Sequence, residues 1–187
     1  MVKRFWDAAE TELDLYHVLS DMLNRNTRWV EVADAKAAAV LVFIGAVIRT
    51  IADPVSDSVR AISADDLLHP EGFIVVIHAL FLLSTLCACL AALWAVYHAF
   101  MTLIPRVSRQ PHRGRMFFAD IAARDAKTWR AAMLEATPAD LVDDLLAQVH
   151  AASVIATAKH THTRMAIGGL FAVLALAPAL YVLSQLT

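Results

Sequence analysis

Residues 29–48 read WVEVADAKAAAVLVFIGAVI, so an acid and a base stand immediately before an apolar run. The acid is Asp34 and the base is Lys36. A charge at the mouth of a membrane helix loses hydration, and it is retained where it binds a ligand or holds a neighbouring group. The stretch therefore predicts a membrane-spanning helix and, at its start, a candidate functional site.

The composition excludes an ordinary soluble domain. Apolar residues make up 59% of the chain and the mean hydropathy is +0.56, whereas soluble domains are about 45–50% apolar. Two further apolar stretches, residues 73–104 and 165–186, are long enough to cross a hydrocarbon core of about 30 Å. We therefore predict an all-α integral membrane protein with transmembrane helices at residues 37–52, 73–104 and 165–186.

The distribution of Lys and Arg predicts the orientation of these spans. Both residue types are frequent before residue 37 and between residues 105 and 164, whereas residues 53–72 are mainly acidic. Cytoplasmic segments carry the excess of Lys and Arg. We expect an inner-membrane protein with a cytoplasmic N-terminus, an external loop at residues 53–72 and an external C-terminus. The first thirty residues contain no apolar stretch of the signal-peptide type, so no signal peptide is expected.

Helical patterns fill the predicted cytoplasmic segments. Asp7 and Glu10 have the spacing of a capping box, which predicts a helix within residues 7–36. Residues 105–164 form a predicted sensor region, with a helix over residues 116–136 after a breaker cluster at residues 110–114. Thr137 and Pro138 then mark the start of a last helix, which meets no Gly or Pro before Gly168. The spans are therefore expected to continue into a cytoplasmic helical bundle.

Seven residues are candidate ligand contacts, chosen because cations bind phosphate, aromatic rings stack on bases and carboxylates accept hydrogen bonds. A charge pair at about 4 Å is worth roughly 4 kcal/mol at an effective dielectric near 20, and a stacked base about 1–3 kcal/mol. Membrane anchoring, packing at the membrane interface and an ion contact within one helix are the competing interpretations. The candidates are Arg28, Lys36 and Lys159, Trp29 and Phe118, and Asp34 and Asp120.

Enzymatic and metal chemistry are not expected. The sequence has no Gly-rich phosphate loop and no nucleophile paired with a base. His160 and His162 are two residues apart, which points their rings to different faces of a helix, so no metal site is predicted with His150. The formal net charge of −2 is too small to steer a charged partner, and we expect no nucleic-acid partner.

Three motifs together resemble the Pycsar effector transmembrane family, PycTM. The first is W-x-x-x-A-D-x-K-A-A, which includes Trp29, Asp34 and Lys36 and precedes an apolar helix. The second is F-F-x-D-I at residues 117–121, and the third is S-x-I-A-x-x-K at residues 153–159. The family pattern leads us to expect an amide at position 153 and an aromatic residue at position 160, where this chain has Ser153 and His160.

The resemblance implies an antiphage effector. A partner pyrimidine cyclase is expected to make cUMP or cCMP on infection, and the effector then impairs the inner membrane, with growth arrest or death of the infected cell. No separate nucleotide-binding domain fits in the chain, so the cytoplasmic helices themselves are expected to form the pocket. Membrane lipid and further copies of the chain are the other expected partners. The alternative is a membrane-anchored adaptor that binds a protein partner through Phe117, Phe118 and Trp129, without ligand gating.

Overall fold

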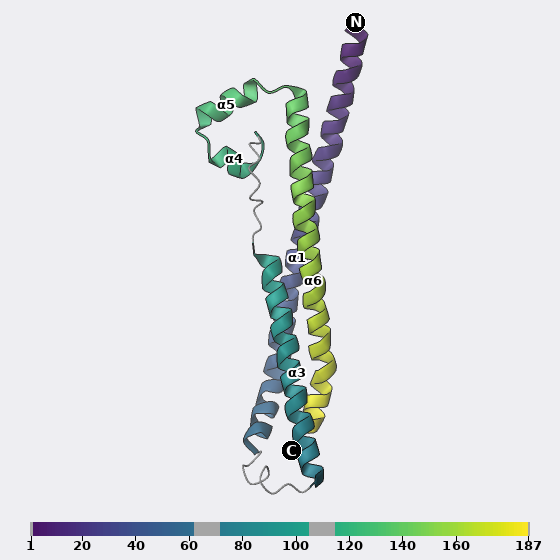
Figure 1. Ribbon diagram of the computed structural model, residues 1–187, viewed down its shortest axis with the longest axis vertical. Coiled ribbons are helices and arrows are strands. Elements are labelled where there is room, and N and C mark those ends of the chain that lie inside the picture. Colours follow the sequence, from purple (N-terminus) through teal and green to yellow (C-terminus); the bar gives the residue numbers. More distant parts are fainter. Residues whose placement is uncertain (1, 62–71, 105–114, 187) are drawn as a thin grey trace. The chain divides into compact units, whose positions relative to one another are not determined.

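The structure, a computed structural model, describes residues 2–61, 72–104 and 115–186, and it is 92% helical with no strand in these ranges (Figure 1). The helices are α1 (Val2–Ala61), α3 (Gly72–Leu103), α4 (Phe118–Ala122), α5 (Ala126–Leu134) and α6 (Pro138–Ser184). Three helical stretches are long and apolar enough to cross a membrane: Asp14–Arg60, Val75–Leu103 and Pro138–Ser184. The first stretch contains residues 37–52, and the other two cover nearly all of the second and third predicted spans. The prediction of an all-α membrane protein with three spans is therefore confirmed.

The contacts divide the chain into two units. Unit 1 comprises Met1–Val32 and Pro105–Ala158, and unit 2 comprises Ala33–Ile104 and Lys159–Thr187. Helices α1 and α6 each contribute to both units, as the uninterrupted sequence after Pro138 predicted for α6. The breaker cluster at residues 110–114 and residues 62–71 of the loop predicted at residues 53–72 lie outside the described residues.

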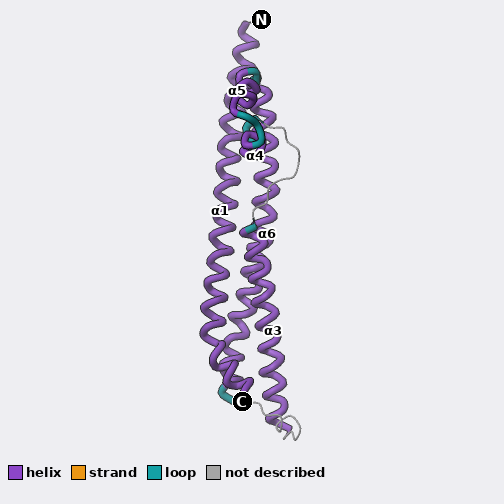
Figure 2. Tube along the Cα trace, turned by 90° about the vertical axis from the view of Figure 1, so that its left-hand side faces the viewer, coloured by secondary structure: helices purple, strands orange, loops and turns teal. Residues whose placement is uncertain are grey.

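Unit 2 is a bundle of α1, α3 and α6, whose ribbons run side by side in both views (Figures 1 and 2). Its core is built from small side chains, which let the helices approach closely. Ala95 and Ala99 of α3 are fully buried with Ala37 of α1 and Ala166 of α6. A Cβ atom on Gly169 would lie 2.7 Å from the Cβ atom of Ala95, so glycine permits the contact between α3 and α6.

At the other end of unit 2, the first membrane helix ends later than the sequence predicted. We expected a loop from residue 53, yet α1 continues through Pro54 to Ala61. Proline inside a helix removes one backbone hydrogen bond. Packing of Val55 near Phe81 and Leu180 compensates for that loss, and the Ser58 hydroxyl donates a hydrogen bond to the Ser184 carbonyl oxygen at 3.1 Å. Tertiary contacts therefore extend the helix beyond the proline.

In unit 1, the first half of α1 packs against the first half of α6. Leu19 of α1 is buried with Val142, Leu145 and Val149 of α6, and Tyr16 packs against this cluster. Helix α1 starts at Val2 rather than near Asp7, because no Gly or Pro precedes Asp7 to interrupt it, so the predicted capping box is not a helix start.

The predicted start of the last helix is confirmed. Helix α6 begins at Pro138, and the Thr137 side chain accepts a hydrogen bond from the Asp140 backbone N–H at 3.3 Å. Asp140 reciprocates by accepting from the Thr137 backbone N–H at 2.9 Å. This reciprocal pair satisfies backbone groups that the first turn of a helix otherwise leaves without partners.

The single helix predicted over residues 116–136 is wrong, since α4 ends at Ala122 and α5 starts at Ala126. The cause is Asp125, whose carboxylate accepts hydrogen bonds from the backbone N–H groups of Lys127 and Thr128 at 3.0 and 2.9 Å. An aspartate in extended conformation at this position starts a new helix instead of continuing the previous one.

The same hydrogen bonds predict a pH dependence for the start of α5. Hydrogen bonds from the Thr128 side chain and from the Thr128 backbone N–H lower the pKa of Asp125 below its usual 3.8. A lowered carboxyl pKa in the folded state stabilises the fold above the unfolded value, and this contribution is lost as the pH falls through the folded value. We expect hydrogen-exchange protection of the Lys127 and Thr128 amides to fall below about pH 3.8.

Two variants separate the charge of Asp125 from its capping function. Asp125→Asn keeps an accepting oxygen, so it should retain protection and lose the pH dependence. Asp125→Ala should lose protection at every pH. Equal protection in wild type and Asp125→Ala would contradict the assignment of Asp125 as the cap.

Candidate functional site

A buried ion pair joins α1 to α6 within unit 2. The Lys159 ammonium contacts both carboxylate oxygens of Asp34, at 2.5 and 2.7 Å. Lys159 is only 5% exposed, whereas the Asp34 side chain keeps 35% of its surface exposed. A cation shielded this well depends on its partner, because burial of an uncompensated charge is costly. Asp34 is therefore the group that allows Lys159 to be buried in an apolar bundle.

Further polar groups lie beside this pair. The Thr163 hydroxyl donates to the Lys159 carbonyl oxygen at 2.9 Å and lies 3.4 Å from the Ala33 carbonyl oxygen. It also lies 3.5 Å from the hydroxyl of Thr102, which donates to the His98 carbonyl oxygen at 3.0 Å. Thr102 and Thr163 are both almost fully buried. The end of the bundle where α1 enters unit 2 is therefore polar, unlike its alanine-rich middle.

Two histidines complete the polar layer, which we define as Asp34, His98, Thr102, Lys159, His162 and Thr163. The Nδ1 atoms of His98 and His162 are 2.8 Å apart, a hydrogen-bond distance. His98 comes from α3 and His162 from α6, so the contact ties these helices together. The layer thus links α6 to both α1 and α3 through polar side chains.

Unit 1 has a separate polar contact between the same two long helices. The Asn26 side-chain amide donates to the Ser153 hydroxyl at 2.8 Å and to the Val149 carbonyl oxygen at 3.3 Å. Ser153 in turn donates to the Val149 carbonyl oxygen at 2.8 Å. Among the described residues, the Gln148 side-chain nitrogen is buried without a hydrogen-bond partner. Amide and hydroxyl groups of this kind discriminate between hydrogen-bonding ligands, because an unmatched group stays unsatisfied.

The structure brings together two of the seven predicted ligand contacts, Asp34 and Lys159. Lys36 belongs to the same unit, and its side chain is exposed on α1. The others belong to unit 1: Arg28 is exposed, Trp29 is 56% exposed and Asp120 is half-buried on α4. The side chain of Phe118 lies outside the described residues.

Trp129, predicted to dock a protein partner in the alternative interpretation, has an internal role. Its indole N–H donates to the Arg115 carbonyl oxygen at 2.9 Å, and the Arg115 backbone N–H donates to the Asp144 carboxylate at 2.7 Å. The Arg115 guanidinium also lies 3.5 Å from the Asp140 carboxylate. These contacts fasten the segment that carries α4 and α5 to the start of α6.

The sequence analysis missed four members of the polar layer: His98, Thr102, His162 and Thr163. A signal existed, because residues four apart share a face of a helix. His98 and Thr102 have this spacing on α3, as do Lys159 and Thr163 on α6. A polar pair at this spacing within an apolar helix indicates a contact with another helix rather than with lipid.

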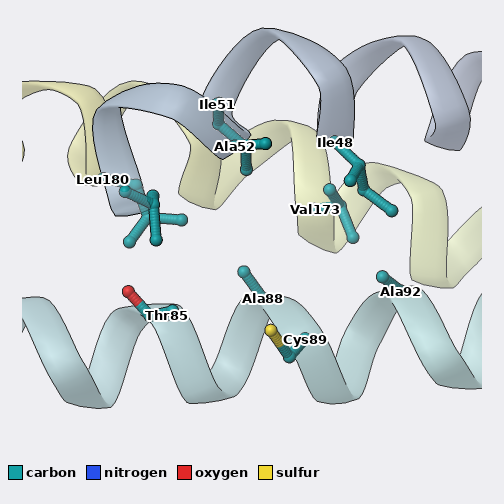
Figure 3. A pocket seen from close by; sticks show the side chains of 10 residues that line it. Ile48, Ile51, Ala52, Thr85, Ala88, Cys89, Ala92, Val173 and Leu180 are labelled. Atoms are coloured by element: carbon teal, nitrogen blue, oxygen red, sulfur yellow. The ribbon is translucent and has the colours of Figure 1, made fainter. Parts of the chain in front are cut away.

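An apolar cavity of about 180 Å³ lies elsewhere in unit 2, lined by side chains of all three helices (Figure 3). The Thr85 hydroxyl at its wall already donates to the Phe81 carbonyl oxygen at 2.8 Å. A phosphate or a base edge would find no charge and few free hydrogen-bonding groups there, so the cavity is unsuited to a nucleotide. The lining residues are Ile48, Ile51, Ala52, Val55, Thr85, Ala88, Cys89, Ala92, Val173 and Leu180.

Comparison with known protein families matches residues 18–186 to PycTM, described as the Pycsar effector protein domain. No curated protein and no solved structure matches the chain. The Pycsar effectors are membrane effectors of antiphage defence, and the match implies a cyclic-nucleotide signal from a cyclase. The match covers most of the sequence and includes the three predicted spans at residues 37–52, 73–104 and 165–186. This chain therefore belongs to the Pycsar effector transmembrane family.

Proposed function

We propose that this effector senses a cyclic pyrimidine mononucleotide, cUMP or cCMP, made by a partner pyrimidine cyclase, and responds by impairing the inner membrane of the infected cell. The observation that supports the proposal best is the buried ion pair between Asp34 and Lys159. An ionisable pair inside a membrane bundle is expensive to maintain and marks functional positions. Family membership supplies the class of signal, and the pair supplies a cation that an anionic ligand can compete for.

The competition has a simple physical basis. A cyclic mononucleotide carries one negative phosphate, which is an alternative partner for the Lys159 ammonium. Lys36, exposed on α1 two residues after Asp34, is a second cation of the same unit. When the phosphate replaces Asp34, α1 loses its ionic link to α6 while the lysine charge stays compensated. Ligand binding thereby weakens one specific helix contact without burying an unpaired charge.

The remaining predicted contacts keep their assigned chemistry in the proposal. Trp29 and Phe118 as stacking groups, and Arg28 and Asp120 as phosphate and ribose contacts, belong to unit 1 and stay predictions from the sequence. We also propose that Lys and Arg place the N-terminus and residues 105–164 in the cytoplasm, where the cyclase product is made.

The membrane response is proposed to require several copies of the chain. The polar layer of unit 2 faces the inside of its bundle, and large apolar side chains such as Phe43, Leu83 and Phe171 are exposed on its outside. A single copy of the chain therefore offers water no polar path through the membrane. Rearrangement among copies, or local disturbance of the surrounding lipid, then impairs the membrane.

Calorimetry on the purified full chain tests ligand sensing. We expect heat of binding with cUMP or cCMP and none with cAMP or cGMP. Lys159→Met and Lys36→Met should each weaken binding by about 10- to 150-fold, the loss expected for one hydrogen bond to a charged group. Lys127→Met, which removes an exposed lysine on α5, is the matched control and should bind as wild type does.

Vesicles that contain the same proteins test the response. Dye release should follow nucleotide binding in wild type and Lys127→Met, and it should be absent in the two weakened variants at the same nucleotide concentration. Absence of binding by any of the four nucleotides, with vesicles that stay sealed, would refute the proposal and favour the adaptor function.

A further inference from the structure

The contact between His98 and His162 in unit 2 has room for one hydrogen. The two Nδ1 atoms are 2.8 Å apart, so one of them must donate and the other must accept. If both carried a hydrogen, two N–H groups would point at each other at a distance that suits only one. The pair therefore depends on its protonation state in a way that a threonine pair does not.

The first added proton is compatible with the contact. It binds the Nε2 atom of the donating ring, which becomes an imidazolium and still donates through its Nδ1–H. The hydrogen bond is then charge-assisted and stronger. A second proton finds only the accepting Nδ1 atom between the rings, since the other nitrogens already carry hydrogens. Its binding replaces the hydrogen bond with a contact between two positive rings.

The surroundings of His98 offer nothing to neutralise that second charge. His98 is 8% exposed, and its Nε2 atom has no hydrogen-bond partner among the described residues. The rings of Trp94 and Tyr97 pack edge-on against it, with centroids 4.4 and 5.1 Å away. Two negative charges would be needed to compensate two imidazolium rings here, and the side chains around His98 are mainly aromatic.

The charged groups on neighbouring turns make a second proton still less favourable. Helix α6 contributes two cations close in sequence to His162, and the nearby carboxylate of α1 is already bound by one of them. The titratable and charged groups on these turns are Asp34 and Lys36 of α1, Tyr97 of α3, and Lys159, His160 and Arg164 of α6. Their formal charges sum to a positive value, so these turns supply no excess of negative charge beside the two rings.

We infer that His98 and His162 form a proton-binding site that holds α3 against α6 while the rings share one hydrogen, and that releases these helices when both rings are fully protonated. Thr102 and Thr163 make a longer polar contact between α3 and α6 in the same layer, at 3.5 Å. The contact is therefore closed while the rings share one hydrogen, and acid opens it.

Thermal unfolding of the purified full chain in detergent tests the inference. The unfolded chain accepts both protons freely and the folded chain does not, so stability must rise with pH across the range in which imidazole titrates. We expect the melting temperature of wild type to fall by at least about 3 °C between pH 7.5 and pH 5.5. His162→Gln, which can still hydrogen-bond to His98 and does not titrate, should lose most of that fall.

His150→Gln is the matched control, because His150 is an exposed histidine of α6 in unit 1. Its melting temperature should follow that of wild type at every pH. A pH dependence that is unchanged in His162→Gln, or that is lost equally in His150→Gln, would overturn the inference.

Nuclear magnetic resonance of the ¹⁵N-histidine-labelled wild type gives a second measurement, which does not require a variant to fold. Above pH 7 we expect opposite Nδ1 states in His98 and His162, one protonated and one bare, and coupling across the hydrogen bond. The coupling should vanish at the pH where the melting temperature falls. Two rings of the same tautomer that titrate independently near pH 6.5 would contradict the shared hydrogen.

Discussion

Asp34→Ala is expected to destabilise the protein by about 3 kcal/mol and to lower the melting temperature by about 6–12 °C. Removal of the carboxylate leaves the Lys159 ammonium, 5% exposed, without its partner in an apolar bundle. The reverse substitution, Lys159→Met, should cost less than about 2 kcal/mol, because the Asp34 side chain is 35% exposed and water can solvate it. Thermal unfolding in detergent measures both effects.

The double variant isolates the pair from other effects of the two substitutions. With Asp34→Ala and Lys159→Met combined, no charge is left buried, so most of the stability lost in Asp34→Ala should return. Glu31→Ala, which removes an exposed acid on the same helix, is the control and should change little. Additive losses in the double variant would show that the two side chains do not depend on each other.

Gly169→Leu should separate α3 from α6 and cost about 1–3 kcal/mol or more. A Cβ atom at Gly169 would lie 2.7 Å from the Cβ atom of Ala95 and 3.0 Å from the Ala91 carbonyl oxygen. The second neighbour is backbone, so a side-chain rotation does not relieve the contact. We expect a lower melting temperature and easier proteolysis of the bundle.

Gly168 provides an internal comparison one residue away. A Cβ atom there meets nothing within 4 Å, so Gly168→Leu should remain within about 1 kcal/mol of wild type. Leucine favours the helix at both positions, which removes helix propensity as an explanation for any difference. Equal stability of the two leucine variants would show that α3 and α6 do not meet closely at Gly169.

The three spans were predictable from the sequence because hydrophobicity and length decide whether a helix crosses a membrane. The continuation of α1 beyond Pro54 was not, since it depends on contacts with residues far away in the sequence, such as the hydrogen bond from Ser58 to Ser184. The break before α5 was readable in principle from Asp125, which competes locally for backbone N–H groups.

For the candidate site, sequence reasoning selected Asp34 and Lys159 separately but did not pair them. It weighed a contact within one helix, whereas the partners are 125 residues apart. Pairing across helices depends on their register, which residue patterns along a single helix do not contain. The contact between His98 and His162 also depends on the register of two helices. The periodic spacing of the polar residues on each helix was its only signal in the sequence.

The distance in sequence between Asp34 and Lys159 has a consequence for biosynthesis. The ribosome makes α1 and α3 before Lys159 of α6, so Asp34 lacks its cation until the last helix has been translated. Lys159, in turn, can be buried favourably only when Asp34 of α1 is present to pair with it. The last helix to be translated therefore completes the ion pair of the first.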